Sequence, residues 1–187
     1  LLILIICCLG WFNFVGINSS AIAQERVFLD LSLKLLDQYE LPAQSFENTE
    51  VGGLSAITYD RQNEIFYAVS DDRSKLAPAR FYTLKINLNQ TDLETVKIAN
   101  VEIKNVTLLK NKQGENYPEN SVDLEGIAVS PRNTLFISSE GNTRKRIPSF
   151  VAEFDFKGNL QQEIPLPERY FPNEKSEPLT KGVQNNL

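Results

Sequence analysis

Short apolar runs separated by turn residues dominate the chain from Val27 onward. The runs are rich in Val, Ile, Phe, Tyr and Thr, which favour strands, and no long stretch has the 3.6-residue apolar period of a helix. We expect strands at Phe28–Tyr39, Leu54–Tyr59, Ile65–Ser70, Phe81–Leu88, Thr95–Leu109, Gly126–Ser130, Leu135–Ser139, Phe150–Phe156 and Leu160–Pro165. Many short strands without helical crossovers indicate an all-β fold of antiparallel sheets, namely a sandwich, a barrel or a propeller.

An internal repeat narrows this choice. The segment that begins at Ser55 aligns without a gap with the segment that begins at Glu125, and the offset of 70 residues places Ile57 on Ile127. Each copy reads strand, tight turn, strand, long polar loop, strand, which is typical of propeller blades; two similar hairpins in a sandwich are the alternative. A closed propeller needs typically 4–8 blades, so we expect a β-propeller fragment of about two blades plus the start of a third, incomplete at its C-terminal end.

The first 23 residues have the features of a targeting segment. Residues 1–15 form an uncharged apolar run that is too short to span a bilayer comfortably, and Ala21 and Ala23 give the small-residue pattern of a signal peptidase site. The chain has no methionine and no basic residue before this run, so we interpret residues 1–23 as an N-terminally clipped signal peptide. Residues 24–187 would then be the N-terminal part of an exported propeller domain, periplasmic or secreted, with no stable membrane span after cleavage. An uncleaved membrane anchor is the alternative.

Composition excludes several classes of function. The formal net charge is -5, which argues against a nucleic-acid partner because binding to phosphate backbones needs a basic surface. The chain contains no histidine, so it cannot itself supply a Ser-His-Asp triad or a His-ligated zinc site. Both cysteines, Cys7 and Cys8, lie in the predicted signal peptide, which leaves the mature chain without disulfides. Oligomeric state is not indicated.

Acidic residues occupy related positions in the two copies of the repeat. Asp71 and Asp72 follow the second strand of the first copy, Glu140 follows the second strand of the other, and Glu125 begins a strand that would line a propeller channel. Oxygen ligands that converge from several blades suit calcium, which takes 6–8 oxygens. We therefore expect Glu125, Asp71, Asp72 and Glu140 to be metal ligands, with Asp123 as a further ligand or a turn cap. Turn formation is the alternative role of Asp71 and Asp72.

Basic residues in the two long loops are candidates for binding phosphate. The loop after the second strand carries Arg73, Lys75 and Arg80 in the first copy and Arg144, Lys145 and Arg146 in the second. Arginine matches phosphate oxygens bidentately, so we select Arg73, Lys75, Arg80 and Arg144 as substrate-binding residues. The alternative for the second loop is a solvated surface. The catalytic residues themselves are not identified by the pattern.

Several ordered motifs resemble one known family. Val51–Ile57 with Phe66–Asp72, followed by Asp123–Ala128 with Ser138–Asn142, resemble successive blades of the bacterial phytase-like family, which is named for an esterase-like activity of phytase. The resemblance implies an exported β-propeller that hydrolyses a small-molecule phosphate ester or ester, and calcium-dependent hydrolysis of compounds such as phytate is the natural analogy. A non-catalytic propeller that binds a ligand or protein, and a lactonase-like metal-dependent propeller enzyme, are the alternatives, because one fold hosts many functions.

Overall fold

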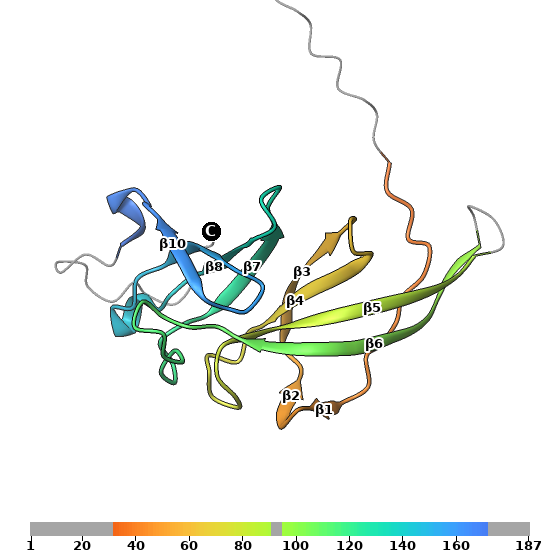
Figure 1. The fold of residues 1–187 in the computed structure, drawn as a ribbon, viewed down its shortest axis with the longest axis horizontal. Helices are drawn as coiled ribbons and strands as arrows, with labels where there is room; N and C mark the ends of the chain where they lie inside the picture. The colour runs from red at the N-terminus through yellow and green to blue at the C-terminus, as the bar shows by residue number, and fades with distance from the viewer. Residues whose placement is uncertain (1–31, 91–94, 172–187) are drawn as a thin grey trace, which may run out of the picture. The chain divides into compact units, whose positions relative to one another are not determined.

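Each copy of the sequence repeat folds into its own four-stranded antiparallel sheet (Figure 1). The structure is a computed structural model that describes residues 32–90 and 95–171, so the predicted signal peptide and the start of a third blade lie outside the described residues. The first sheet contains β3 (Leu54–Asp60), β4 (Ile65–Ser70), β5 (Arg80–Gln90) and β6 (Val96–Leu108). The second contains β7 (Leu124–Val129), β8 (Leu135–Ser139), β9 (Phe150–Phe154) and β10 (Leu160–Ile164). In both sheets the strands pair in chain order.

The remaining elements are short. A hairpin of β1 (Gln44–Phe46) and β2 (Thr49–Val51) precedes the first sheet. The single-turn 3-10 helices are η1 (Thr143–Lys145) and η2 (Glu168–Tyr170). No other helix occurs in residues 32–90 and 95–171, which confirms the all-β prediction for that part of the chain. Within the same residues, no helix is long and apolar enough to cross a membrane.

Most of the expected strands are present. β4 and β8 have the predicted bounds, and the others differ by a few residues. The expected strand at Phe28–Tyr39 is wrong for its described part, because residues 32–39 form no strand and pair with no other strand. Leu33 and Leu35 there are 102% and 80% exposed, so they lack the packing that stabilises an edge strand. The β1–β2 hairpin was not expected.

A matched irregularity confirms the internal repeat in the first strand of each sheet. The gapless alignment is wrong for the second strands, because Leu54 pairs with Ser70 whereas Leu124 pairs with Ser139, an offset of 69 residues (139 − 70). The register of β3 against β4 shifts between Leu54 and Ala56, and that of β7 against β8 shifts between Leu124 and Gly126. The extra residue is therefore Ser55 in one sheet and its repeat partner Glu125 in the other. Bulges of this kind re-aim a side chain at the end of a strand pair.

The two sheets bury their facing sides against each other. Side chains alternate along each strand, so Val69 and Phe81 enter a core shared with Leu124 and Ile137 of the second sheet. The neighbouring side chains of the first sheet, such as Ala68 and Tyr82, pack on its opposite face beneath Val51 and Phe46 of the hairpin.

The first strands of the two sheets lie side by side. Ser55 Oγ in β3 donates a hydrogen bond of 2.7 Å to the carbonyl oxygen of Leu124 in β7. The amide of Val129 in β7 donates to Thr58 Oγ1 at 3.3 Å. Two four-stranded meanders that meet along their first strands are consistent with neighbouring propeller blades, although the described residues do not close a ring. The corresponding ends of both sheets therefore meet at one place.

Candidate functional site

Three carboxylates from the two sheets converge at these matching ends. Asp71 directly follows β4, Asp123 directly precedes β7, and Glu125 is the bulged residue of β7. One ligand oxygen from each lies within 4.8 Å of the others. We call Asp71, Asp123 and Glu125 the carboxylate cluster.

Equivalent backbone contacts place these residues. The amide of Asp71 donates to the carbonyl of Gly53 at 2.7 Å, and the amide of Glu140 donates to the carbonyl of Asp123 at 3.0 Å. Gly53 and Asp123 are repeat partners, so the same strand-end geometry occurs in both sheets. Leu124 points into the core and is 1% exposed, which directs Asp123 and Glu125 away from the core.

Arg73 fixes the position of Asp123. Its Nε donates to Asp123 Oδ1 at 2.9 Å, and its Nη2 lies 2.9 Å from Oδ2. The Asp123 amide also donates to Ser139 Oγ at 2.9 Å, which anchors the backbone. The hydrogen bond to Asp123 raises the pKa of Arg73, so the guanidinium stays protonated. A bidentate arginine–carboxylate pair is geometrically well defined, and Asp123 is therefore pre-positioned.

Burial and repulsion between the carboxylates disfavour the ionised forms of Asp71 and Glu125. Burial raises the pKa of Asp71 to about 7, and a hydrogen bond with Asp123 and repulsion by neighbouring carboxylates act in the same direction. Burial, followed by repulsion from Glu140 and Asp123, also raises the pKa of Glu125. Asp71 Oδ1 is buried with no hydrogen-bond partner among the described residues. Oxygen donors of this kind fit a hard divalent cation, which would supply the missing partner.

Glu140 lies at the edge of the cluster. Burial raises the pKa of its carboxyl, and repulsion from Asp123 adds to the effect while Arg73 opposes it. The charges of Asp123 and Arg73 act on both Glu140 and Asp71, so the two carboxyls lie near each other, as the repeat predicts. It is not one of the three residues whose ligand atoms lie within 4.8 Å.

Two of the predicted site residues form a buried pair instead. Arg80 is 1% exposed, and its Nη1 lies 2.7 Å from Asp72 Oδ2. Arg80 also donates to Tyr82 Oη at 2.7 Å and to the carbonyl of Glu50 at 2.8 Å, while Asp72 Oδ1 accepts from the Ser74 amide. The structure therefore places Arg80 and Asp72 in the framework that supports the loop, and does not bring them into the cluster.

The other predicted cations differ in their surroundings. Arg73 is engaged by Asp123, as described above. Lys75 and Arg144 are exposed, and neither forms an ion pair within the described ranges. The structure brings neither of them into contact with the carboxylate cluster.

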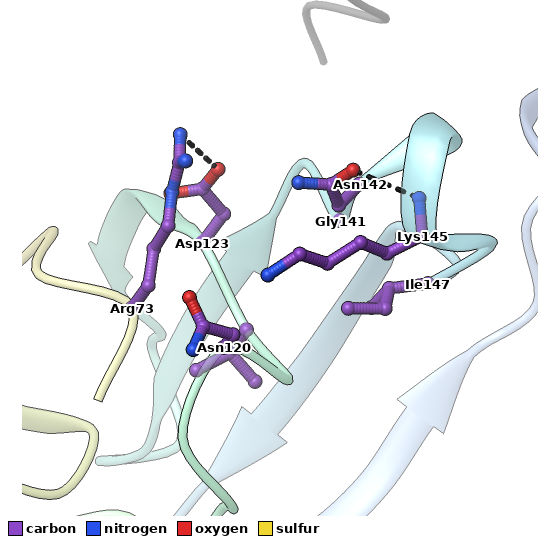
Figure 2. A pocket seen from close by; sticks show the side chains of 8 residues that line it. Arg73, Asn120, Asp123, Gly141, Asn142, Lys145 and Ile147 are labelled. Atoms are coloured by element: carbon purple, nitrogen blue, oxygen red, sulfur yellow. Dashed lines mark hydrogen bonds and ion pairs between the residues drawn. The ribbon is translucent and has the colours of Figure 1, made fainter. Parts of the chain in front are cut away.

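Two hollows flank the cluster. A groove of about 550 Å³ beside Asp71 is lined by the β1–β2 hairpin and the loop that follows β4, including Gln44, Glu50, Gly53 and Leu76. On the side of Asp123 lies a notch of about 10 Å³, room for about one water molecule. Figure 2 shows the notch between Arg73, Asn120, Asn142 and Lys145. The carboxylate cluster therefore contributes to both hollows.

The sequence pattern selects only some of the polar residues of the notch. It selects Arg73 as a substrate-binding residue and Asp123 as a further ligand or turn cap, and it places Lys145 in the basic loop without selecting it. Lys145 is the repeat partner of Lys75, yet the two lysines differ in structure, because only the loop of the second sheet carries η1. Nothing in the sequence pattern marks Asn120, whose role depends on the packing of separate loops.

A protein-family model matches most of the chain. The family model Phytase-like, described as esterase-like activity of phytase, matches residues 49–187. This range contains both four-stranded sheets and every residue of the carboxylate cluster. No curated protein and no solved structure gives a significant match.

Proposed function

Since the chain belongs to the phytase-like family, we propose that it is an exported, calcium-dependent hydrolase of small-molecule phosphate esters. The family supports a phytase-like or esterase-like hydrolase. The dependence on calcium, the phosphate-ester substrate and the export are the parts of the proposal that go beyond the family.

The convergence of Asp71 with Asp123 and Glu125 carries the proposal. These carboxylates come from two separate sheets, yet their oxygens lie within 4.8 Å of one another. Burying like charges together is unfavourable unless a cation or a proton compensates them. Calcium prefers carboxylate oxygens and tolerates irregular geometry, so Asp71, Asp123 and Glu125 would hold it, with Glu140 adjacent. When bound, such a cation would polarise a phosphoryl oxygen as a Lewis acid.

The chain's own residues prepare this site. Arg73 orients Asp123 and partly balances its charge, so one ligand is fixed before a cation arrives. Asp71 has a pKa of about 7 in the cation-free site, so cation binding would displace its proton. The buried Asp72–Arg80 pair supports the loop that carries Asp71.

The groove beside Asp71 supports a substrate with an uncharged organic part. Its lining includes Glu50, Asp71 and Asp72 together with Leu76, and contains no lysine or arginine. A volume of about 550 Å³ lies within the range of small-molecule sites. A ligand as highly charged as phytate would find no cation there, so the groove suits the uncharged organic part of an ester.

The proposal of export depends on residues 1–23. The apolar run and the small residues at Ala21 and Ala23 support cleavage by signal peptidase and release into the periplasm or the medium. Expression of the chain with its native N-terminus, followed by N-terminal sequencing of the exported form, tests this part. Cleavage after Ala23 is the expected result, and retention of residues 1–23 would contradict it.

A phosphatase assay tests the hydrolase. The protein is incubated with 4-nitrophenyl phosphate after treatment with a chelator, and calcium is then restored. We expect chelation to abolish turnover and calcium alone to restore it. Glu125→Gln should lower kcat at least tenfold, because one ligand oxygen loses its charge. Glu115→Gln, the same change at an exposed carboxylate, should have no effect.

Two results would contradict the proposal. Turnover that survives chelation would remove the role of calcium. Stabilisation by calcium without turnover of any ester would favour a non-catalytic propeller that uses the cation structurally.

A further inference from the structure

The notch on the Asp123 side of the cluster is built by three separate loops. Arg73 comes from the loop after β4, Asn120 from the segment before β7, and Asn142 and Lys145 from the loop after β8. The Asn120 amide donates to the carbonyl of Arg73 at 2.7 Å, which joins the first two loops. Asn142 and Ile147 exchange two backbone hydrogen bonds of 2.9 Å, which close the third loop.

The backbone of these loops adopts an unfavourable conformation at several positions. Arg73 and Ser74 both have φ of 56°, and Arg146 has φ of 57°. This left-handed region is unfavourable for non-glycine residues other than asparagine and aspartate. Such conformations persist where the surrounding structure holds them, and they gather at ligand sites.

Two hydrogen-bond donors in the notch lack partners. The Lys145 ammonium forms no ion pair or hydrogen bond with any of the described residues. Asn142 Oδ1 accepts from the Lys145 amide at 3.0 Å, which leaves Asn142 Nδ2 without an acceptor in the described part of the chain. Figure 2 shows the Lys145 side chain extended toward Asn120 and the Arg73–Asp123 pair. Lys145 is exposed and Asn142 is half-buried, so both donors are accessible to a ligand that offers an acceptor oxygen.

We infer that Lys145 and the Asn142 amide bind one oxygen of a phosphate or phosphonate group in the notch, beside the carboxylate cluster. The space of about 10 Å³ admits one such oxygen, and the rest of the group lies at the mouth. An ammonium and an amide N–H₂ are suitable donors for an anionic oxygen.

Charge makes this binding depend on a cation. Ligand oxygens of Asp71, Asp123 and Glu125 lie within 4.8 Å of one another, and the Glu140 amide donates to the Asp123 carbonyl. These carboxylates outnumber the two cations that line the notch, Arg73 and Lys145. An anion would be repelled until a divalent cation compensates the excess. Binding of the anion and of calcium is therefore coupled, and each strengthens the other by the same factor. This dependence rests on the proposed function, whereas the contacts of Lys145 and Asn142 do not.

Calorimetric titration with methylphosphonate tests the inference, because its P–C bond is not a phosphate ester. With calcium present we expect the wild-type chain to bind, and Lys145→Gln to bind about tenfold more weakly, the usual loss for a hydrogen bond from a charged group. Asn142→Asp keeps the oxygen that accepts from the Lys145 amide but replaces the free N–H₂, so it should also weaken binding. Lys157→Gln, at an exposed lysine of the β9–β10 turn, is the matched control and should bind as wild type.

Each result has a defined meaning. Wild-type affinity in both Lys145→Gln and Asn142→Asp, with unchanged melting temperatures, would overturn the inference, as would no binding by the wild-type chain. Binding that needs Lys145 in a protein without phosphatase activity would keep the anion site while removing the proposed hydrolase.

Discussion

Arg73, in the loop after β4, contacts Asp123, which directly precedes β7, through two bonds of equal length, Nε to Oδ1 at 2.9 Å and Nη2 to Oδ2 at 2.9 Å. The Asp123 side chain is 4% exposed and that of Arg73 is 40% exposed. This pair ties the loop after β4 to the start of β7, the two segments that bring the carboxylate cluster together. Its loss should affect stability and cation binding together.

Arg73→Gln should lower the free energy of unfolding of the cation-free protein by about 1–3 kcal/mol. The buried Asp123 carboxylate would lose its partner, and the partial exposure of Arg73 keeps the cost below that of a fully buried pair. Urea denaturation in the presence of a chelator measures the change. Arg61→Gln, at an exposed arginine, should change stability by no more than about 0.5 kcal/mol. Equal stability of the two variants would show that the pair contributes nothing.

Stability of the cation-free protein should fall as pH rises from about 4 to about 7. Asp71 has a pKa of about 7 in the folded chain against 3.8 ordinarily, so the folded state holds an extra proton across this range. The stabilisation is complete below pH 3.8 and is lost as pH rises through about 7. Glu125 and Glu140, whose pKa values are also raised, act with the same sign. Melting temperatures in chelator at several pH values measure the slope, and Asp71→Asn should reduce it. An unchanged slope in that variant would contradict the assignment.

Gly53→Ala should weaken calcium binding more than Gly52→Ala. Gly53 has φ of +58°, and a Cβ there would lie 2.9 Å from the carbonyl oxygen of Asp71, whereas a Cβ at Gly52 meets nothing within 4 Å. The first substitution strains the backbone by about 1–2 kcal/mol and displaces Asp71. Comparison of calcium affinity and melting temperature in the two variants tests this. Equal calcium affinities would show that the position of Asp71 does not depend on its close approach to Gly53.

Arg80→Lys should destabilise the fold by about 2–4 kcal/mol without raising KM for a phosphate ester. Lysine cannot reproduce the bonds that the buried guanidinium makes to Asp72, Tyr82 and Glu50. Chemical denaturation and steady-state kinetics on the folded fraction separate the two effects. Unchanged stability with a raised KM would contradict this prediction and would support the substrate-binding role that the position of Arg80 in the loop predicts.

Strands were predictable where the local pattern is strong. β4 and β8 are continuous apolar segments between turn residues. Their bounds match the prediction because a short apolar run between turn signals is typical of a buried strand. The three-residue strands β1 and β2 are too short to show alternation. Residues 32–35 alternate polar residues with leucine, as a strand does, but strand formation also needs a neighbouring strand, which this pattern does not reveal.

Site residues were predictable only as far as the repeat specifies them. The repeat places Asp71 and Glu125 at matching sheet ends, and the structure brings them together. It does not reveal which of two adjacent aspartates faces the cluster, because Asp72 is drawn to Arg80 by packing between separate segments. Similarly, Lys145 and Asn142 line the same notch as Asn120, which belongs to a separate loop. The notch therefore cannot be predicted without the fold.

Direct titration with calcium tests the central claim that the two sheets build one cation site. We predict that the wild-type chain binds about one calcium ion by isothermal calorimetry. Asp71→Asn in the first sheet and Glu125→Gln in the second should each weaken binding at least tenfold, while Glu115→Gln binds as wild type. Absence of calcium binding by the wild-type chain, or wild-type affinity in both cluster variants, would contradict the account.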